Sequence, residues 1–168
     1  YAEKAEYQKI NTTSTNSQYH MLKKLELTQN DFREINNYCF LQKIDFLSTA
    51  FDLESLRFLT EELNLDTLKI PSGDLTNGPL LLEHSLRAKK LIVSTGMSSV
   101  EDIRSALGII AFGLLQTKDN PSLNKFEQIY NSKNGQRILK DKVTILHCTT
   151  AYPAPFNEIN LNSMLTLK

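Results

Sequence analysis

A lysine inside an apolar segment is the first residue that indicates chemistry. Lys69 lies between Leu68 and Ile70, so its side chain is expected to enter a protein layer, where an unpaired ammonium is costly. The ammonium therefore needs an anion. A carboxylate of a neighbouring strand could supply it, a bound phosphate or carboxylate could do so, or the amine could form a Schiff base with a substrate.

The residues that follow Lys69 favour a phosphate over a Schiff base. Ser72 offers a hydroxyl, and Gly73 allows a backbone N–H group to approach an anion closely. Asp74 could act as an acid or a base or bind sugar hydroxyls. We interpret Asp52, by contrast, as the N-cap of a helix.

Further hydroxyl groups stand at comparable places in the chain. The pairs Ser48-Thr49 and Ser94-Thr95 each follow an apolar run. Taken singly, such residues are more often caps or turn residues. If the runs are neighbouring parallel strands, the hydroxyls form one weakly basic pocket together with Lys69.

The histidines and cysteines predict packing rather than a metal site or a disulfide framework. The neighbours His147 and Cys148 would point to opposite faces of a strand. His20 and His84 lie in helical segments and are interpreted as surface or packing residues. Cys39 and Cys148 both have apolar surroundings, which suits a reducing compartment, so the cytoplasm is the expected location.

Four short apolar runs must position these groups. Each ends abruptly in small or polar residues, and none alternates strictly between apolar and polar, which is typical of strands buried on both faces of a parallel sheet. The runs are 46–52, 68–74, 91–97 and 143–150.

The segments between these runs have a helical period. The pairs Thr28/Asp31 and Ser98/Glu101 are interpreted as capping boxes, and a further helix is predicted over 80–90. Strict alternation of strand and helix implies an α/β fold with right-handed βαβ units. Because no nucleotide-binding glycine loop follows any strand and the polar groups share one strand end, a TIM barrel is favoured over an open sheet.

Residues 119–142 interrupt this rhythm. We interpret them as a surface insertion, made of a helix and a turn at 133–135, with a partner contact as the alternative. The polar first stretch, residues 1–17, is expected to contain a loop at 12–16 and to lie at the mouth of the barrel if a strand precedes it.

Composition narrows the possible partners. The chain has 168 residues, with 19 basic and 19 acidic side chains. With a net charge of zero, the chain lacks the long-range positive potential of most proteins that bind nucleic acids or anionic membranes. We therefore expect neither a nucleic acid nor a membrane as a partner. The apolar runs are shorter than the ~20 residues of a membrane-spanning helix. The chain starts at Tyr1 and stops inside an apolar-periodic stretch, which we interpret as an excerpt of a longer protein.

Four ordered motifs extend over most of the chain. They are Phe46-Leu-Ser-Thr-Ala-Phe-Asp52, Lys69-Ile-Pro-Ser-Gly-Asp-Leu-Thr-Asn77, Ser94-Thr-Gly-Met97 and Leu146-His-Cys-Thr-Thr-Ala-Tyr-Pro-Ala-Pro155. Together they resemble the sialic acid synthase family, which includes N-acetylneuraminate, legionaminate and pseudaminate synthases.

This resemblance implies a TIM-barrel enzyme that condenses phosphoenolpyruvate with an N-acetylmannosamine-type sugar, giving a nonulosonic acid and phosphate. The strands of this chain would be the third to the sixth of the barrel. A divalent Mn²⁺ or Mg²⁺ would polarise the sugar aldehyde, with its histidine ligands outside this chain. The full-length enzyme is expected to be a homodimer.

The resemblance also implies roles for individual residues. Those expected to hold phosphoenolpyruvate are Thr49, Lys69, Ser72 and Ser94. Tyr152 would line the sugar pocket, and Asp74 would join Lys69 as a catalytic residue. Asp74 stands where many members have glutamate, which shortens a sugar contact, and Thr150 stands where some have asparagine, which affects one hydrogen bond to the ligand.

Several family motifs do not occur in this sequence. They are the opening Ala-Glu-Ile-Gly-x-Asn-His and Lys-x-Gln, the closing Ser-Asp-His and Glu-Lys-His-Phe, and the small antifreeze-like domain that usually follows the barrel. We therefore expect no turnover from these residues alone. Two alternatives stay open: another phosphoenolpyruvate-condensing barrel, such as a 3-deoxy-octulosonate phosphate type synthase, and an anion-binding fragment without chemistry.

Overall fold

The chain divides into two compact units. The computed structural model describes residues 3–11 and 17–168, so the loop expected at 12–16 lies outside the described residues. The first unit comprises Tyr1–Phe46 and Ala151–Glu158, and the second comprises Leu47–Thr150 and Ile159–Lys168.

The first unit is helical over most of its described length. Its elements are α1 (Glu6–Asn11), α2 (Gln18–Lys23), α3 (Gln29–Gln42) and a 3-10 turn at Phe156–Glu158. The Thr28 hydroxyl accepts the Asp31 N–H at 3.2 Å, and the Asp31 carboxylate accepts the Thr28 N–H at 2.7 Å. This reciprocal pair satisfies two free N–H groups at the start of α3 and confirms the capping box predicted there.

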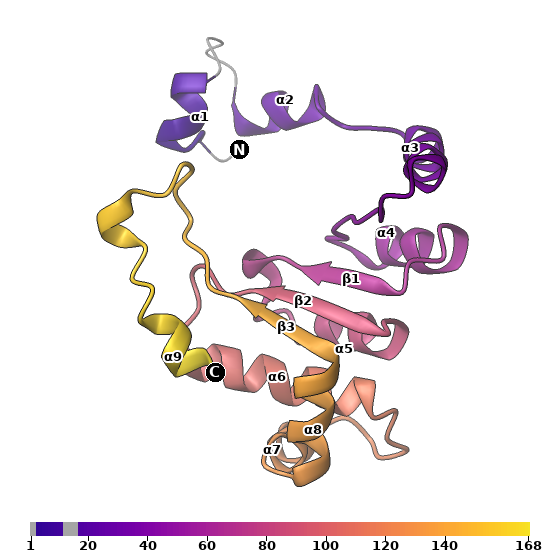
Figure 1. Ribbon diagram of the computed structural model, residues 1–168, viewed down its shortest axis with the longest axis vertical. Coiled ribbons are helices and arrows are strands. Elements are labelled where there is room, and N and C mark those ends of the chain that lie inside the picture. Colours follow the sequence, from indigo (N-terminus) through magenta and orange to yellow (C-terminus); the bar gives the residue numbers. More distant parts are fainter. Residues whose placement is uncertain (1–2, 12–16) are drawn as a thin grey trace. The chain divides into compact units, whose positions relative to one another are not determined.

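The second unit is built on a parallel sheet (Figure 1). Its strands are β1 (Thr67–Ile70), β2 (Lys90–Ser94) and β3 (Val143–Leu146), in the order β1-β2-β3. Thr49 adds an isolated parallel bridge to Lys69 of β1. The run predicted as the first strand is thus reduced to one bridge, whereas the other three runs contain the expected strands in parallel.

Helices alternate with these strands, as the sequence predicted. Before β1 come α4 (Leu53–Arg57) and a π-helical turn at Phe58–Glu62; then α5 (Gly78–Arg87) follows β1, and α6 (Val100–Leu114) follows β2. The remaining helices are α7 (Leu123–Tyr130) and α8 (Lys133–Lys142) before β3, and α9 (Ser163–Leu167) after it. The helices α5 and α6 pack against each other beside the sheet (Figure 1).

The core lies between the sheet and these helices. Leu68 and Ile70 of β1 and Leu91 and Val93 of β2 are each 1% exposed. Because side chains alternate between the two faces of a strand, these residues share the face covered by helices. Ile110 of α6 is fully buried on the helix side of this core. Lys69 must therefore lie on the opposite face of the sheet.

Side-chain caps start the helices of this unit. Asp52 accepts the Ser55 N–H at 2.7 Å and the Ser55 hydroxyl at 2.8 Å, which confirms its interpretation as the N-cap of α4. These hydrogen bonds, the backbone one foremost, lower the pKa of the Asp52 carboxyl.

The prediction of a capping box at Ser98/Glu101 was wrong, because the box lies one residue later in the sequence. Ser99 and Asp102 form it instead, with the Asp102 N–H donating to Ser99 Oγ at 3.1 Å and the Ser99 N–H donating to the Asp102 carboxylate at 2.9 Å. The reason is the preceding turn: the Ser98 N–H donates to the Thr95 carbonyl at 2.9 Å, so α6 begins after Ser99.

Two further predictions of local structure were wrong. The helix expected over 80–90 is α5 and ends at Arg87, because the Lys90 N–H donates to the Asp66 carbonyl at 3.1 Å and Lys90 opens β2. The turn expected at 133–135 is the first turn of α8, because Ser132 Oγ accepts the Gly135 N–H at 2.9 Å. The segment 119–142 therefore contains two helices rather than one helix and a turn.

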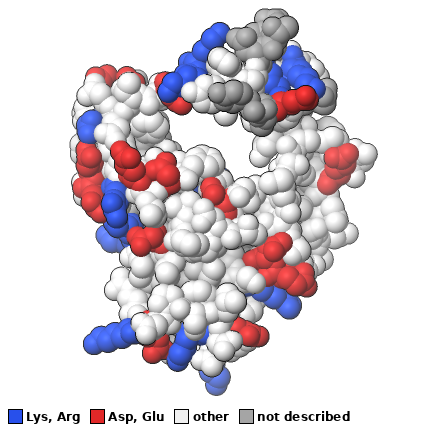
Figure 2. Space-filling view, turned by 180° about the vertical axis from the view of Figure 1, so that it is seen from behind, with Lys and Arg blue, Asp and Glu red and all other residues white. Residues whose placement is uncertain are grey.

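Charges of both signs are mixed on the surface. Figure 2 shows acidic and basic side chains in small groups rather than in one continuous patch on the face drawn. This agrees with the equal numbers of acidic and basic residues, 19 of each. Within the described residues, no helix has the length and apolar character needed to cross a membrane.

Candidate functional site

Lys69 lies on the face of the sheet opposite to the buried residues of β1. It is half-buried. Its neighbours across the strands are Thr49, through the isolated bridge, and Ile92 of β2, which pairs in register with Thr144 of β3. None of these neighbours is charged, so the strands beside Lys69 provide no anion at its level of the sheet.

Lys69 also forms no ion pair elsewhere in the residues that the structure describes. The ion pairs of the second unit join Arg87 to Glu61 and Glu83, and Lys89 to Asp66; the others are Lys125 with Asp119 and Lys142 with Asp141. The carboxylate of a neighbouring strand, one of the alternatives left open by the sequence, is thus not found there. The ammonium is available to a bound anion.

The turn after β1 carries two further polar side chains, those of Ser72 and Asp74. Pro71 ends β1 because it has no N–H for the ladder, and a 3-10 turn over Ser72–Asp74 follows, with the Asp74 N–H donating to the Pro71 carbonyl at 3.1 Å. Within the described part of the chain the Ser72 hydroxyl makes no hydrogen bond. Asp74 Oδ1 lies 3.5 Å from Asn77 Nδ2, at the limit of a hydrogen bond.

Hydrogen bonds join the turn after β2 to the end of β3. The Thr95 N–H and its hydroxyl both donate to the Leu146 carbonyl, at 3.2 and 3.0 Å. One residue further, the Gly96 N–H donates to Cys148 Sγ at 3.2 Å. Ser94, at the end of β2, is 7% exposed. These bonds bring the carboxyl ends of β2 and β3 together.

The turns after β1 and β2 also touch. A Cβ atom added at Gly96 would lie 3.0 Å from Ser72 Oγ, so the Ser72 side chain packs directly on the Gly96 backbone. Together with the bridge between Thr49 and Lys69, this contact gathers the carboxyl ends of neighbouring strands. We call Thr49, Lys69, Ser72 and Ser94 the strand-end cluster.

This arrangement is suited to holding an anion. An ammonium supplies charge, and hydroxyl groups can donate hydrogen bonds to phosphate or carboxylate oxygens. The packing of Ser72 on Gly96 and the Gly96–Cys148 bond were missed by the sequence reasoning. The only signal for them was the small residue that follows Ser94-Thr95.

Two further predicted substrate residues, Thr150 and Tyr152, follow β3 in the sequence. Thr150 is exposed beyond the end of β3. Tyr152, which is 59% exposed, belongs to the first unit. Their assignments to the ligand and to the sugar pocket stay predictions.

The histidines serve local structure. His84 is 1% exposed and Nδ1 donates to the Leu80 carbonyl at 2.9 Å. Burial lowers the pKa of His84, while that hydrogen bond and the charge of Asp74 act in the opposite direction. His147 Nε2 donates to the Ile159 carbonyl at 2.7 Å. Among the described residues, no group of three His, Cys, Asp or Glu side chains gathers that could hold a metal ion.

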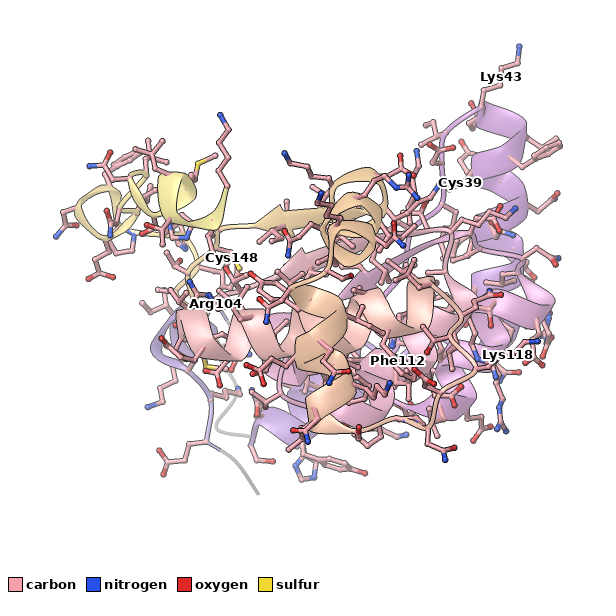
Figure 3. All side chains as sticks on the ribbon, turned by 90° about the horizontal axis from the view of Figure 1, so that it is seen from below. Cys39, Lys43, Arg104, Phe112, Lys118 and Cys148 are labelled. Atoms are coloured by element: carbon pink, nitrogen blue, oxygen red, sulfur yellow. The ribbon has the colours of Figure 1, made fainter. Side chains whose placement is uncertain are left out.

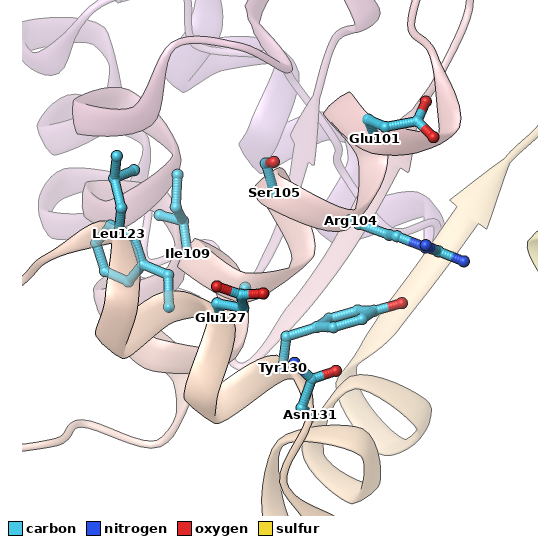
Figure 4. Close-up of a pocket in the computed structure, with 10 residues that line it drawn as sticks. Glu101, Arg104, Ser105, Ile109, Leu123, Glu127, Tyr130 and Asn131 are labelled. Carbon is cyan, nitrogen blue, oxygen red and sulfur yellow. The ribbon is translucent and has the colours of Figure 1, made fainter.

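A separate groove lies between α6 and α7 (Figure 4). Its volume is about 630 Å³. Arg104, Ser105 and Tyr130 contribute polar groups, and Ile109 and Leu123 contribute apolar walls. It lies on the side of α6 that turns away from the sheet, so it is distinct from the strand-end cluster.

The fold and the cluster define a class of protein before any comparison. A parallel α/β unit whose strands present an unpaired lysine and hydroxyl groups at their carboxyl ends is typical of α/β enzymes that bind anionic substrates. The chain belongs to the NeuB family: the model of that family matches residues 1–168. The resemblance to sialic acid synthases drawn from the motifs is confirmed.

Individual relatives agree with this assignment. The chain is 41% identical over 167 residues to N,N'-diacetyllegionaminic acid synthase of Campylobacter jejuni subsp. jejuni, covering 99% of this chain and 43% of that protein. It is 36% identical to the protein of the same name from Legionella pneumophila, covering 98% of this chain and 40% of the relative. The chain therefore spans well under half the length of these curated relatives.

A solved structure shares the fold. It is the N-acetylneuraminic acid (sialic acid) synthetase from Leptospira borgpetersenii serovar Hardjo-bovis, in complex with citrate. The TM-score is 0.64 at 25% sequence identity, over 84% of this chain and 40% of that one.

Proposed function

We propose that this chain is part of a synthase that condenses phosphoenolpyruvate with an N-acetylmannosamine-type sugar to give a nonulosonic acid and phosphate. The observation that carries the proposal is the Lys69 ammonium, which has no carboxylate partner in the described part of the chain and lies at strand ends that also carry hydroxyl groups. Membership of the NeuB family supports the reaction class.

We propose further that the complete fold is a TIM barrel. The parallel sheet of this chain has helices on one face, and its other face carries Lys69 and Ile92. In a barrel that second face becomes the interior, and the carboxyl ends of the strands form the mouth that holds the substrates. The bridge at Thr49 and the strands β1 to β3 would then be the third to the sixth strands.

In the proposed reaction, Lys69 and the hydroxyls of Thr49, Ser72 and Ser94 hold phosphoenolpyruvate through its phosphate and carboxylate. The methylene carbon of phosphoenolpyruvate donates its π electrons to the aldehyde carbon of the open-chain sugar, forming the new C–C bond, and the aldehyde oxygen takes up a proton. Water adds to C2 and loses its proton. The C–O bond to the phosphate then breaks as the C2 hydroxyl passes its proton to the departing phosphate, so a 2-keto acid and inorganic phosphate are released.

The other assigned residues concern the sugar. Asp74 would accept a hydrogen bond from a sugar hydroxyl or move a proton at the aldehyde oxygen. Among the described residues, the one side-chain hydrogen bond of its carboxylate is the long contact to Asn77 Nδ2, at 3.5 Å. Thr150 would donate a hydrogen bond to the ligand, and Tyr152 would line the sugar pocket. These roles follow the family resemblance.

A divalent Mn²⁺ or Mg²⁺ is expected from the same resemblance. The described residues of this chain do not assemble a ligand set for it, because no three His, Cys, Asp or Glu side chains gather among them. The expectations of a homodimer and of a cytoplasmic enzyme likewise remain part of the proposal for the full-length protein.

Two alternatives have different consequences. Another phosphoenolpyruvate-condensing barrel would bind phosphoenolpyruvate but would prefer a different aldehyde. An anion-binding fragment without chemistry would bind it and release no phosphate with any sugar. A protein with no Lys69-dependent binding would belong to neither group.

Calorimetric titration with phosphoenolpyruvate tests the proposal. We expect one site, and we expect Lys69→Met to weaken binding by about 10-fold or more, since a hydrogen bond to a charged group contributes ~1.5–3 kcal/mol. Lys90→Met is the matched control, because Lys90 is exposed at the opposite end of the neighbouring strand β2. No binding by the unaltered protein, or equal losses in the two variants, would contradict the proposal.

A second measurement concerns the chain by itself. We predict no release of phosphate when residues 1–168 alone are given phosphoenolpyruvate and N-acetylmannosamine. Robust turnover would show that the missing family motifs are not needed.

A further inference from the structure

The contact between Ser72 and Gly96 connects two turns that the sequence separates. Ser72 lies in the 3-10 turn after β1, and Gly96 lies in the turn after β2. A Cβ atom at Gly96 would lie 3.0 Å from Ser72 Oγ and 3.2 Å from Ser72 Cβ. Rotation of the Ser72 side chain would relieve the first contact but not the second, so a Cβ atom at position 96 requires the two turns to separate by a few tenths of an ångström.

Gly96 is not required by its own backbone conformation. Its φ is not positive, so an alanine could adopt the same dihedral angles. The constraint is therefore the space that Ser72 occupies. At Gly96, an added Cβ atom would crowd Ser72 alone. Ser72 is a proposed ligand of the anion, so the absence of a side chain at position 96 helps to set where its hydroxyl lies.

Cys148 also contacts Gly96. Its Sγ accepts the Gly96 N–H at 3.2 Å and would lie 3.6 Å from a Cβ at Gly96. Cys148 lies just beyond the end of β3 (Figure 3), and the two hydrogen bonds from Thr95 to the Leu146 carbonyl hold the same turn against that strand. The turn after β2 is therefore held to the end of β3 by hydrogen bonds, and it packs on Ser72.

We propose that Gly96 and Cys148 are positioning residues. Cys148 holds the Gly96 backbone through a hydrogen bond, and the Ser72 side chain packs on Gly96, which places the Ser72 hydroxyl for the anion. This inference rests on the proposed function, because it assigns Ser72 to the phosphoenolpyruvate site. Neither positioning residue contacts the substrate in this account. A displacement of the Ser72 hydroxyl by a few tenths of an ångström is enough to weaken its hydrogen bond to an anion.

A double-mutant cycle on phosphoenolpyruvate affinity in the full-length protein tests the link between Gly96 and Ser72. We expect Ser72→Ala to weaken binding about 10-fold or more and Gly96→Ala at least threefold. The double variant should bind within about twofold of Ser72→Ala, because the displaced hydroxyl is already absent. Losses that multiply would overturn the inference. Gly78→Ala is the matched control, since its Cβ meets only Ile109 Cδ1 at 3.4 Å, and its affinity should be unchanged.

A measurement without ligand tests the link between Cys148 and Gly96. We expect the Gly96 amide hydrogen to exchange at least fivefold faster in Cys148→Ala, because its acceptor is gone, while Cys148→Ser keeps an acceptor and should stay closer to the unaltered protein. Unchanged exchange in Cys148→Ala overturns that link. If the unaltered protein does not bind phosphoenolpyruvate, the proposed function fails, and the exchange rates still decide whether Cys148 holds Gly96.

Discussion

Lys69→Met distinguishes a lysine that is held for a ligand from one that is needed for the fold. Its neighbours across the strands are Thr49 and Ile92, and it has no ion pair in the described part of the chain. Breaking a buried ion pair costs about 3–5 kcal/mol. Replacing an unpaired, half-buried ammonium by an apolar side chain of similar length should instead leave the free energy of unfolding within ~1 kcal/mol, or raise it.

Urea unfolding measures this difference. The chain has no tryptophan, so far-UV circular dichroism is the suitable signal, and Lys69→Met, Lys90→Met and the unaltered protein are compared at a common slope. Lys90 lies at the exposed start of β2 and controls for the general effect of removing a strand lysine. A loss of more than ~2 kcal/mol in Lys69→Met alone would refute the reasoning, because it would reveal a structural partner for the ammonium.

Three further predictions concern the scaffold that holds the strands. Gly113→Ala should destabilise the protein by about 1–3 kcal/mol, because its Cβ would lie 2.7 Å from Ser85 Cβ where α5 packs on α6. Adding Ser85→Gly should recover part of that loss in thermal unfolding. If the losses of stability of the two single variants simply add in the double variant, this packing explanation is contradicted. Burial lowers the pKa of His84, so the unfolded chain binds a proton that the folded one does not: stability should fall as the pH drops below ~6.5, and a pH series on His84→Leu should lack that component. Ser99→Ala should cost about 1 kcal/mol in chemical denaturation while Ser98→Ala costs little, and the reverse order would restore the box predicted from the sequence.

The sequence predicted the order of the elements better than their ends. The runs around Leu68, Leu91 and Val143 are strands in one parallel sheet, because apolar runs of this length between amphipathic helices have few other places to be buried. The ends depended on backbone hydrogen bonds that residue types do not specify. The shift of the α6 cap from Ser98 to Ser99 follows from one such bond, between the Ser98 N–H and the Thr95 carbonyl.

For the candidate site too, the sequence predicted one part and missed another. The side-chain types around Lys69 and Ser72 indicated an anion site, since chemistry depends on residue type. The contact of Ser72 with Gly96 and the Gly96–Cys148 bond join residues that are distant in the sequence. Such contacts arise from the register of β1, β2 and β3, which no local pattern contains.

The direct test of the central claim is phosphate release from phosphoenolpyruvate by the full-length protein, measured with and without N-acetylmannosamine-type sugars. We predict release that requires such a sugar and that Lys69→Met lowers about 10-fold or more in kcat/KM, while Lys90→Met leaves it unchanged. Release that is independent of any such sugar, or a Lys69→Met variant as active as the unaltered protein, would contradict the account.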